Sequence, residues 1–219
     1  MPAQTRSARS RNHVIPTARQ ILKHFDRQDP VLAATIRKIG PLRLRRNRNY
    51  FQVLCKAIVS QQISTRVAEV IHGRFQALFE GRTPTPGRVA ATPEAALRGV
   101  GLSRQKVAYL HDLSARFLDQ TIRPHQLNYL DNEDIVQRLI AVHGIGRWTA
   151  EMFLIFSLNR MDVLPVGDLG LRAAVQALYQ LPGLPGAKQL RSLGEAWHPL
   201  ETVATWYAWR TLDEQIINY

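Results

Sequence analysis

Cysteine is almost absent from this sequence, since Cys55 is the only one among 219 residues. A single thiol cannot form an intramolecular disulfide, an all-cysteine zinc site or a four-cysteine iron–sulfur cluster. The scarcity of cysteine also fits a reducing compartment. The seven histidines and Cys55 show no metal-ligand spacing, so we expect them to be structural. We therefore expect no iron–sulfur cluster and no cofactor for catalysis.

Long apolar runs and strand patterns are also missing. No run approaches the ~20 apolar residues that a membrane-spanning helix needs. The first fifteen residues are basic and polar, without the apolar core of a signal peptide. No convincing alternation of polar and apolar residues indicates a strand, whereas apolar residues at helical spacing recur along the chain. We expect a soluble, intracellular, all-α protein without a membrane partner.

Acidic residues are scarce at the front of the chain. Residues 1–50 carry twelve Lys and Arg against Asp26 and Asp29, a net charge of +10, whereas the rest carries seventeen against fifteen, a net charge of +2. A basic N-terminal segment followed by a nearly neutral remainder indicates a polyanion partner, and nucleic acid is the first candidate. A solubilising basic tail is the alternative.

The chain, 45% hydrophobic, is long enough for one large domain or two small lobes with a real core. Residues 1–13 are rich in Arg and Ser without periodicity, and we expect a flexible basic tail. Residues 81–92 are rich in Pro, Gly and Thr and should form a loop. Apolar spacing, capping residues and proline at first helical positions predict helices at 17–25, 31–39, 50–59, 64–79, 92–98, 103–118, 168–179, 190–195 and 199–217, with two more inside 131–157.

The most informative stretch is residues 139–154, where two apolar segments with helical spacing flank Gly144-Ile145-Gly146. The glycines permit backbone conformations that are closed to other residues. Asp131, with Asp134 three residues later, is typical of a capping box on the first helix. Because the second helix begins at the glycines, its first-turn N–H groups lie on a surface that a phosphate can approach closely. The alternative is an ordinary helical hairpin whose glycines only allow tight packing.

Several motifs occur together in one order along the chain: Phe51 to Ser64, Gly101 to Lys106, Val142-His-Gly-Ile-Gly146, Leu164-Pro-Val-Gly-Asp168 and Ala204 to Trp209. From about residue 20 to the C-terminus the sequence resembles the helix-hairpin-helix/Gly-Pro-Asp superfamily of DNA glycosylases. Within that superfamily it resembles the 3-methyladenine DNA glycosylase II (AlkA-type) branch. Any one motif is weak, but their joint occurrence is specific.

The resemblance implies a two-lobed helical bundle. Residues 51–158 would form a central lobe with the helix-hairpin-helix at about 131–157, and residues 14–50 and 159–219 would form the other lobe. The active site would lie in the cleft between the lobes. AlkA-type bacterial enzymes usually begin with a β-rich domain, and we expect no N-terminal β domain here. A monomer is expected.

The resemblance assigns the essential carboxylate to Asp168. Such a carboxylate stabilises the oxocarbenium character of the sugar and can orient or deprotonate the attacking water. Asp162 is a nearby competitor on the wrong side of Pro165. The alternative interpretation of Asp168 is a plain N-cap of the following helix.

Position 148 distinguishes the subtypes. Related glycosylase/lyases place a nucleophilic lysine two residues after the second glycine, where this chain has Trp148, so the resemblance implies a monofunctional enzyme that leaves an abasic site. Trp148, Trp206 and Trp209 would form an aromatic base pocket that suits cationic N-alkylated purines. Core packing is the alternative for each tryptophan. Met152 stands where relatives often have an aromatic residue, which implies a wider pocket.

The DNA contacts implied by the resemblance fall into two groups. Gln61 and Gln62, after the first buried helix, would form the wedge that fills the gap left by the extruded base; a polar helix end in solvent is the alternative. The phosphate contacts would be Gly144, Ile145, Gly146, Arg147 and Thr149 in the hairpin, and Gly101, Ser103 and Lys106 in a second glycine turn. For that second turn, a simple helix-terminating role is the alternative.

Two further expectations follow from the resemblance. The backbone carbonyls of Ile140, Val142 and Ile145 would hold a structural Na⁺ or K⁺ that bridges to a phosphate. Glu201 stands where relatives commonly carry an arginine, and this change is either a surface exchange or an altered DNA contact.

The function expected from the sequence is removal of alkylated bases from double-stranded DNA in base excision repair. A glycosylase for oxidised or mismatched bases is a rival within the same class, and a non-catalytic helix-hairpin-helix DNA-binding protein is a rival from another class. The expected location is the cytoplasm, at the nucleoid, in a bacterium, or the nucleus in a eukaryote.

Overall fold

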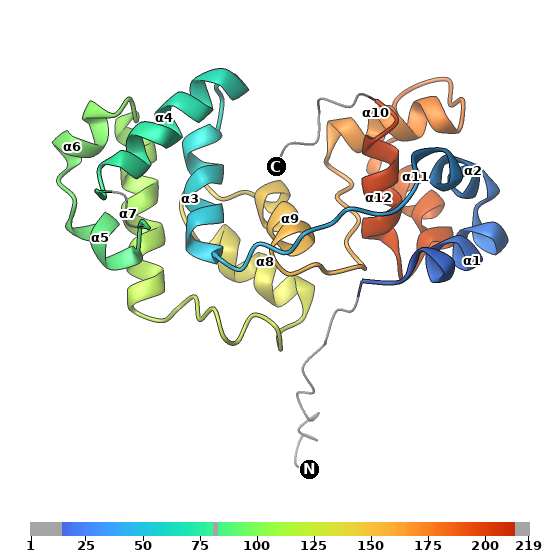
Figure 1. The fold of residues 1–219 in the computed structure, drawn as a ribbon, viewed down its shortest axis with the longest axis horizontal. Helices are drawn as coiled ribbons and strands as arrows, with labels where there is room; N and C mark the ends of the chain where they lie inside the picture. Colours follow the sequence, from blue (N-terminus) through green and yellow to red (C-terminus); the bar gives the residue numbers. More distant parts are fainter. Residues whose placement is uncertain (1–14, 81–82, 213–219) are drawn as a thin grey trace, which may run out of the picture. The chain divides into compact units, whose positions relative to one another are not determined.

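The computed structural model describes residues 15–80 and 83–212 (Figure 1). Within these residues every regular element is a helix, which confirms the all-α prediction. The basic tail predicted for residues 1–13 lies outside the described residues. The elements in chain order are α1 (Ala18–Gln28), α2 (Pro30–Ile39), α3 (Tyr50–Ser60), α4 (Thr65–Ala77), α5 (Pro86–Ala91), α6 (Glu94–Gly99), α7 (Arg104–Leu118), α8 (Asn132–Ile140), α9 (Arg147–Phe156), α10 (Leu169–Leu178), α11 (Ala187–Gly194), the 3₁₀ helix η1 (Glu195–Trp197) and α12 (Glu201–Trp209).

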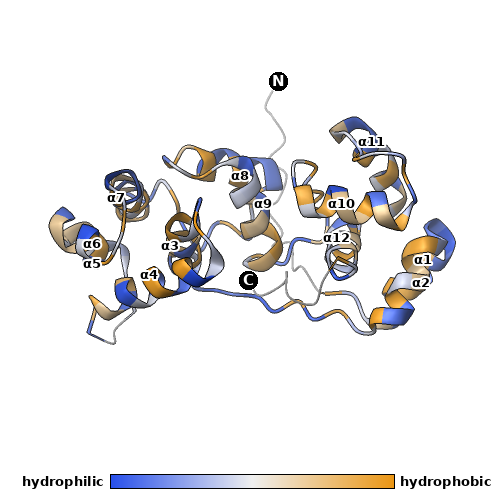
Figure 2. Cartoon of the chain, turned by 90° about the horizontal axis from the view of Figure 1, so that it is seen from above, coloured by the Kyte–Doolittle hydropathy of each residue, from blue (hydrophilic) through white to orange (hydrophobic). Residues whose placement is uncertain are grey.

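The chain divides into two compact units. The first unit contains Asn47–Phe153, and the second combines the segment that ends at Arg46 with the segment that starts at Leu154. The N-terminal helices α1 and α2 therefore share a unit with the C-terminal helices α10, α11 and α12. The helices carry both hydrophobic and hydrophilic residues (Figure 2), as expected of elements that bury one face in a core.

In the first unit, α7 is the central support and packs against α3, α5 and α6. Its residues Val107, Leu110 and Leu113 are buried at helical spacing. Ser103 caps its N-terminus by accepting a hydrogen bond from the backbone N–H of Lys106 at 3.2 Å. Helix α3, which packs against α7, is apolar along most of its length, as predicted from the sequence. Its Cys55 is buried, and burial raises the pKa of the thiol.

In the second unit, α12 forms the centre of the core. All residues from Thr202 to Trp209 are buried, which is typical of a helix that is covered on every side. The helix packs against α2 and α10. The hydroxyl of Thr202 donates to the carbonyl of Arg160 at 2.6 Å, so this buried hydroxyl is satisfied.

A buried carboxylate connects three parts of the second unit. Asp29 caps α2 through the backbone N–H of Leu32 at 3.0 Å. The indole of Trp197 donates to the other oxygen of Asp29 at 2.8 Å, and the hydroxyl of Tyr179 donates to the same oxygen. Burial and the carboxylate of Asp29 raise the pKa of Tyr179. The carboxylate is therefore surrounded by hydrogen-bond donors of the unit itself.

Two predicted segments differ from the structure. The loop predicted for residues 81–92 is wrong for its second half, which is the helix α5, capped by Thr85 and started by Pro86. The proline that suggested a loop is a favourable first helical residue, and Val89 is buried. The last helix, predicted for 199–217, is shorter as described: α12 ends at Trp209 and turns follow to residue 212, and the remainder lies outside the described residues.

Candidate nucleic-acid interface and catalytic carboxylate

The two glycines of the hairpin between α8 and α9 have different structural roles. Gly144 has φ +84, and a Cβ there would lie 2.1 Å from a ring carbon of Tyr109. Gly146 has no positive φ, and a Cβ there would meet nothing within 4 Å. Gly144 is therefore required by the fold, whereas the surface over Gly146 is open. Asp131 occupies the N-cap position of α8 but makes no cap hydrogen bond through its side chain, so the predicted capping box is wrong.

The hairpin turn is held from α7 and from the end of α3. The side-chain amide of Gln61 donates to the carbonyl of Gly144 at 2.6 Å. The carboxylate of Asp112 accepts the backbone N–H of His143 at 2.7 Å and lies 2.8 Å from its Nδ1. Partial burial acts to raise the pKa of Asp112, but the hydrogen bonds from His143 and the charge of Arg116 hold that pKa below its ordinary value. The turn is thus fixed by two polar side chains from outside the hairpin.

The N-terminus of α9 begins beside the open glycine. The backbone N–H of Ala150 bonds to the carbonyl of Gly146 at 3.1 Å, so Gly146 occupies the cap position. Glycine has no side chain that could cap the first turn, and the positive end of the helix dipole lies there. This end of the helix has the chemistry of an anion site.

Arg147, predicted as a phosphate contact, is paired within the hairpin. Its guanidinium makes two hydrogen bonds to Glu133 of α8, at 2.6 and 3.1 Å, and lies 3.9 Å from Glu151. The hydrogen bonds from Arg147 lower the pKa of Glu133. The arginine therefore connects α9 to α8, and a phosphate contact would require it to share or exchange these partners.

The pocket residues Trp148 and Met152 and the predicted phosphate contact Thr149, all on α9, differ in exposure. Trp148 is 41% exposed, whereas Thr149 and Met152 are buried. Trp148 is thus one of the large hydrophobic side chains that remain exposed among the described residues. Trp148 and Met152 belong to the first unit, whereas Asp168, Trp206 and Trp209 belong to the second. The pocket that the resemblance implies stays a prediction.

The second glycine turn uses its polar groups inside the protein. Gly101 has φ +104, and a Cβ there would lie 3.3 Å from Ile71. The Ser103 hydroxyl caps α7. The ammonium of Lys106 donates to the carbonyl of Val59 at 2.7 Å, at the end of α3, and burial lowers the pKa of Lys106. The turn thus ends α6 and leads into the cap of α7, and the phosphate contact predicted for it stays a prediction.

The two predicted wedge residues, in the turn after α3, have different environments. Gln61 is engaged with Gly144, as described above. Gln62 is exposed and has φ 57, a left-handed conformation that is uncommon for a residue other than glycine. Ser64 then caps α4 through the backbone N–H of Val67 at 3.5 Å, as predicted. Of the pair, Gln62 is the residue presented on the surface.

Asp168 is buried at the N-cap of α10. Its Oδ1 accepts the backbone N–H of Leu171 at 2.6 Å and the indole N–H of Trp209 at 2.8 Å. The backbone N–H of Asp168 donates to the carbonyl of Pro165 at 2.9 Å and closes the preceding turn. The carboxylate is therefore a cap and is also held in one orientation by a side chain from α12. A carboxylate fixed in this way can act in chemistry as well as in capping.

Trp209 has a contact that the sequence did not reveal. It was predicted as a wall of the base pocket, and the structure makes it a hydrogen-bond donor to the candidate catalytic carboxylate. Its ring also stacks on Phe156, with centroids 6.0 Å apart and planes at 16°. Trp206 is buried against Tyr207, and the guanidinium of Arg210 lies 5.8 Å from its ring centroid. Both tryptophans therefore serve in packing as well.

A Cβ on Gly170 would lie 3.2 Å from Oδ1 of Asp168 and 3.5 Å from the ring of Trp209. Gly170 is not among the site residues predicted from the sequence, although a glycine two positions after a cap is a usable signal of close approach. Glu201 stands where relatives were expected to carry an arginine. Its carboxylate lies 2.9 Å from the ring nitrogen Nδ1 of His198. Asp162 is exposed.

The backbone carbonyls of Ile140, Val142 and Ile145 were predicted to hold a Na⁺ or K⁺. Ile140 ends α8, where helix carbonyls lack intrahelical partners, and the carbonyl of Val142 accepts the N–H of Ile145 at 3.1 Å. Neutral carbonyl oxygens at the negative end of a helix suit a monovalent cation. Across residues 15–80 and 83–212, no group of three His, Cys, Asp or Glu is placed to hold a metal. No helix in the same residues is long and apolar enough to cross a membrane.

Comparisons with known proteins agree with this geometry. Residues 55–199 match the family described as HhH-GPD superfamily base excision DNA repair protein. DNA-3-methyladenine glycosylase 1 of Schizosaccharomyces pombe is 34% identical over 173 residues, which are 78% of this chain and 76% of that protein.

Two solved structures are similar along nearly the whole chain. The crystal structure of DNA-3-methyladenine glycosidase from Bacillus halodurans has a TM-score of 0.82 at 35% identity and covers 90% of this chain and 91% of its own. The 3-methyladenine DNA glycosylase of S. pombe in complex with abasic DNA has a TM-score of 0.76 at 32% identity, with 88% and 96% covered. This chain belongs to the HhH-GPD superfamily of base excision DNA repair proteins.

Proposed function

We propose that this protein is a monofunctional DNA glycosylase of the 3-methyladenine DNA glycosylase II type. It hydrolyses the N-glycosidic bond of alkylated bases in duplex DNA and leaves an abasic site. The observation that carries the proposal is the buried carboxylate of Asp168, which accepts the N–H groups of Leu171 and Trp209. Asp168 lies within residues 55–199, which match the family. The names of the relatives support alkylated bases as substrates and DNA as the partner.

The carboxylate supplies the chemistry. As the bond between C1′ and the base nitrogen breaks, positive charge develops on the sugar, and a fixed anion stabilises it. Water adds its oxygen to C1′, and the carboxylate orients that water and accepts its proton, while the electron pair of the broken bond leaves with the base. The bond from Trp209 fixes the direction of the carboxylate before the substrate arrives.

Trp148 is the reason to propose hydrolysis without strand cleavage. A lyase step needs an amine that forms a Schiff base with C1′, and the position where related lyases carry lysine holds an indole. The partly exposed indole can instead stack on a base, and a cationic alkylated purine gains cation–π attraction that a normal base lacks. The choice between an alkylated and a normal base would then depend on charge as well as on shape.

The hairpin is proposed to hold the DNA backbone. The first turn of α9 beside Gly146 would take a phosphate, and Arg147 would add its charge. The carbonyls of Ile140, Val142 and Ile145 would hold a Na⁺ or K⁺, which would supply positive charge next to that phosphate. Gln62 is proposed as the wedge, because it is the exposed member of its pair.

The test is mass-spectrometric identification of bases released from methylated duplex DNA under single-turnover conditions. We expect alkylated purines to be released and alkali-labile abasic sites to remain, with no borohydride-trapped protein–DNA adduct. The Trp148→Lys variant should form some trapped adduct, because it places an amine at that position. Binding without base release would identify a non-catalytic DNA-binding protein, and trapping of the unaltered protein would overturn the monofunctional assignment.

A further inference from the structure

Helix α1 of the second unit carries a row of cations that the proposed function does not use. Arg19, Lys23 and Arg27 follow one another at four-residue spacing, and all three are exposed. This spacing places them on one face, separated by about 6 Å along the helix axis. We call these three residues the α1 stripe.

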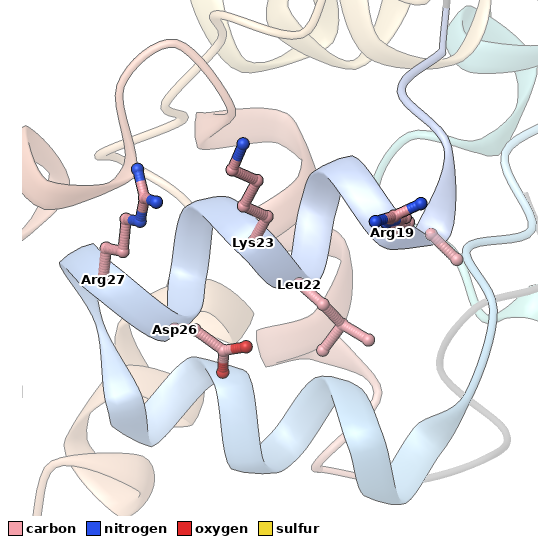
Figure 3. Close-up of a pocket in the computed structure, with 6 residues that line it drawn as sticks. Arg19, Leu22, Lys23, Asp26 and Arg27 are labelled. Atoms are coloured by element: carbon pink, nitrogen blue, oxygen red, sulfur yellow. The ribbon is translucent and has the colours of Figure 1, made fainter.

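The side chains of α1 separate by charge. In Figure 3, Lys23 and Arg27 project to one side of the helix, whereas Leu22 and Asp26 point toward α2. Ile21 and Phe25 are buried in the unit. The outward side of the helix is therefore cationic, and its apolar side is already used for packing.

The acidic residues of the same segment do not neutralise the stripe. Asp26 forms an ion pair with Arg37 of α2. Asp29 is buried, and its oxygens accept from Leu32, Tyr179 and Trp197. Among residues 15–80 and 83–212, the side chains of the α1 stripe form no ion pair with an acidic group.

We propose that the α1 stripe is an accessory binding surface for the phosphate backbone of duplex DNA, separate from the hairpin. Three uncompensated cations in a row match a polyanion whose charges also repeat along a line. The ammonium of Lys23 and the guanidinium groups of Arg19 and Arg27 would contact phosphate oxygens and not base edges. The surface therefore adds affinity without base specificity. The inference rests on the proposed function only for the choice of DNA as the polyanion.

The experiment compares salt dependence of binding to an undamaged duplex. The stripe variant carries Arg19→Gln, Lys23→Gln and Arg27→Gln. A control variant removes the same charge elsewhere through Arg98→Gln, Lys188→Gln and Arg191→Gln, three exposed residues of α6 and α11. The measured quantity is the slope of log Kd against log salt concentration, obtained by fluorescence anisotropy.

We expect the stripe variant to have a slope smaller in magnitude by about 2 to 3, because each lost phosphate contact removes about 0.9 from it. Lys23→Gln alone should give about one third of that change. The control variant should keep a slope close to that of the unaltered protein, and a damaged duplex should give the same difference as an undamaged one.

Two results would overturn the inference. An unchanged slope in the stripe variant would mean that DNA does not contact α1. An equal loss in the control variant would mean that only total charge matters. If the unaltered protein binds DNA and releases bases while either result holds, the accessory surface fails and the proposed function stands. If it does not bind duplex DNA at all, both fail.

Discussion

Helices α9 and α10 both begin after a turn that contains glycine, and the two first turns are completed in opposite ways. The residue before α9 is Gly146, which brings no side chain and leaves open space. The residue before α10 is Asp168, whose carboxylate occupies the helix end and accepts two N–H donors. A helix N-terminus attracts an anion in either case. The first turn of α9 therefore has open space and no side-chain cap at its glycine, whereas the first turn of α10 holds a carboxylate of the protein itself.

Helix α7 provides a third case inside the first unit. It also follows a glycine turn, but Ser103 caps it and Lys106 donates to Val59. The neutral hydroxyl of Ser103 accepts one N–H of the first turn, where Gly146 offers no side-chain acceptor. A glycine turn before a helix is therefore insufficient to indicate a phosphate site, and the identity of the cap residue decides between the alternatives.

The change with the largest expected effect is Asp168→Asn, which keeps the cap but removes the charge at α10. Asparagine caps helices about as well as aspartate, and its carbonyl can accept from Trp209, so stability should change little. Base release should fall by about 10²- to 10⁴-fold, while DNA affinity stays or rises. Single-turnover kinetics and thermal unfolding measure the two effects. Near-normal turnover would show that Asp168 is only a cap.

The next change compares the two hairpin glycines. Gly144→Ala forces a positive φ on alanine and a clash with Tyr109, and it should lower the free energy of unfolding by about 2–5 kcal/mol. Gly146→Ala should cost at most about 1 kcal/mol. Its methyl group instead stands where a phosphate would approach, and duplex affinity should fall about tenfold, equivalent to about 1.4 kcal/mol.

Chemical denaturation and anisotropy on damaged and undamaged duplexes separate these outcomes. If Gly146→Ala binds both duplexes as tightly as the unaltered protein, the first turn of α9 does not hold the backbone.

A smaller effect distinguishes Gln61 from Gln62. Gln61→Ala removes the hydrogen bond to Gly144 that holds the α9 turn, and it should weaken binding to all duplexes about fivefold, which corresponds to ~1 kcal/mol. Gln62→Ala leaves that turn intact and should selectively slow excision from well-stacked pairs, where extrusion costs most. The measurement is the ratio of excision rates for matched and mismatched duplexes. A ratio that drops for Gln61→Ala rather than for Gln62→Ala would reverse the two assignments.

The smallest expected effect is that of Ser103→Ala at α7. Loss of the cap should cost about 1 kcal/mol of stability, and DNA affinity should stay within about twofold, because this helix end is closed by the protein itself. Urea unfolding and anisotropy provide the two values. An affinity loss as large as that of Gly146→Ala would show that both glycine turns bind DNA.

Local signals predicted most of the helices. Ser64 caps α4 as predicted, and Asp168 caps α10 as its alternative interpretation stated, because a cap bonds to an N–H group only three residues away. The loop prediction for residues 81–92 fails at α5 because Pro and Gly often break helices, whereas Thr85 and Pro86 here form a helix start. The Asp131 cap failed because a suitable residue type does not ensure that the side chain makes the bond.

The helical class, the hairpin with its two glycines and the aspartate at the start of α10 could all be predicted from the sequence, because helical periodicity, glycine and capping act within a few residues. The partners of the functional groups depend on how the helices pack. Trp209 reaches Asp168 across 41 positions, Lys106 reaches Val59 across 47, and Gln61 reaches Gly144 across 83. Hydrogen bonds between such distant residues form only after the helices pack, and no local pattern in the chain encodes them.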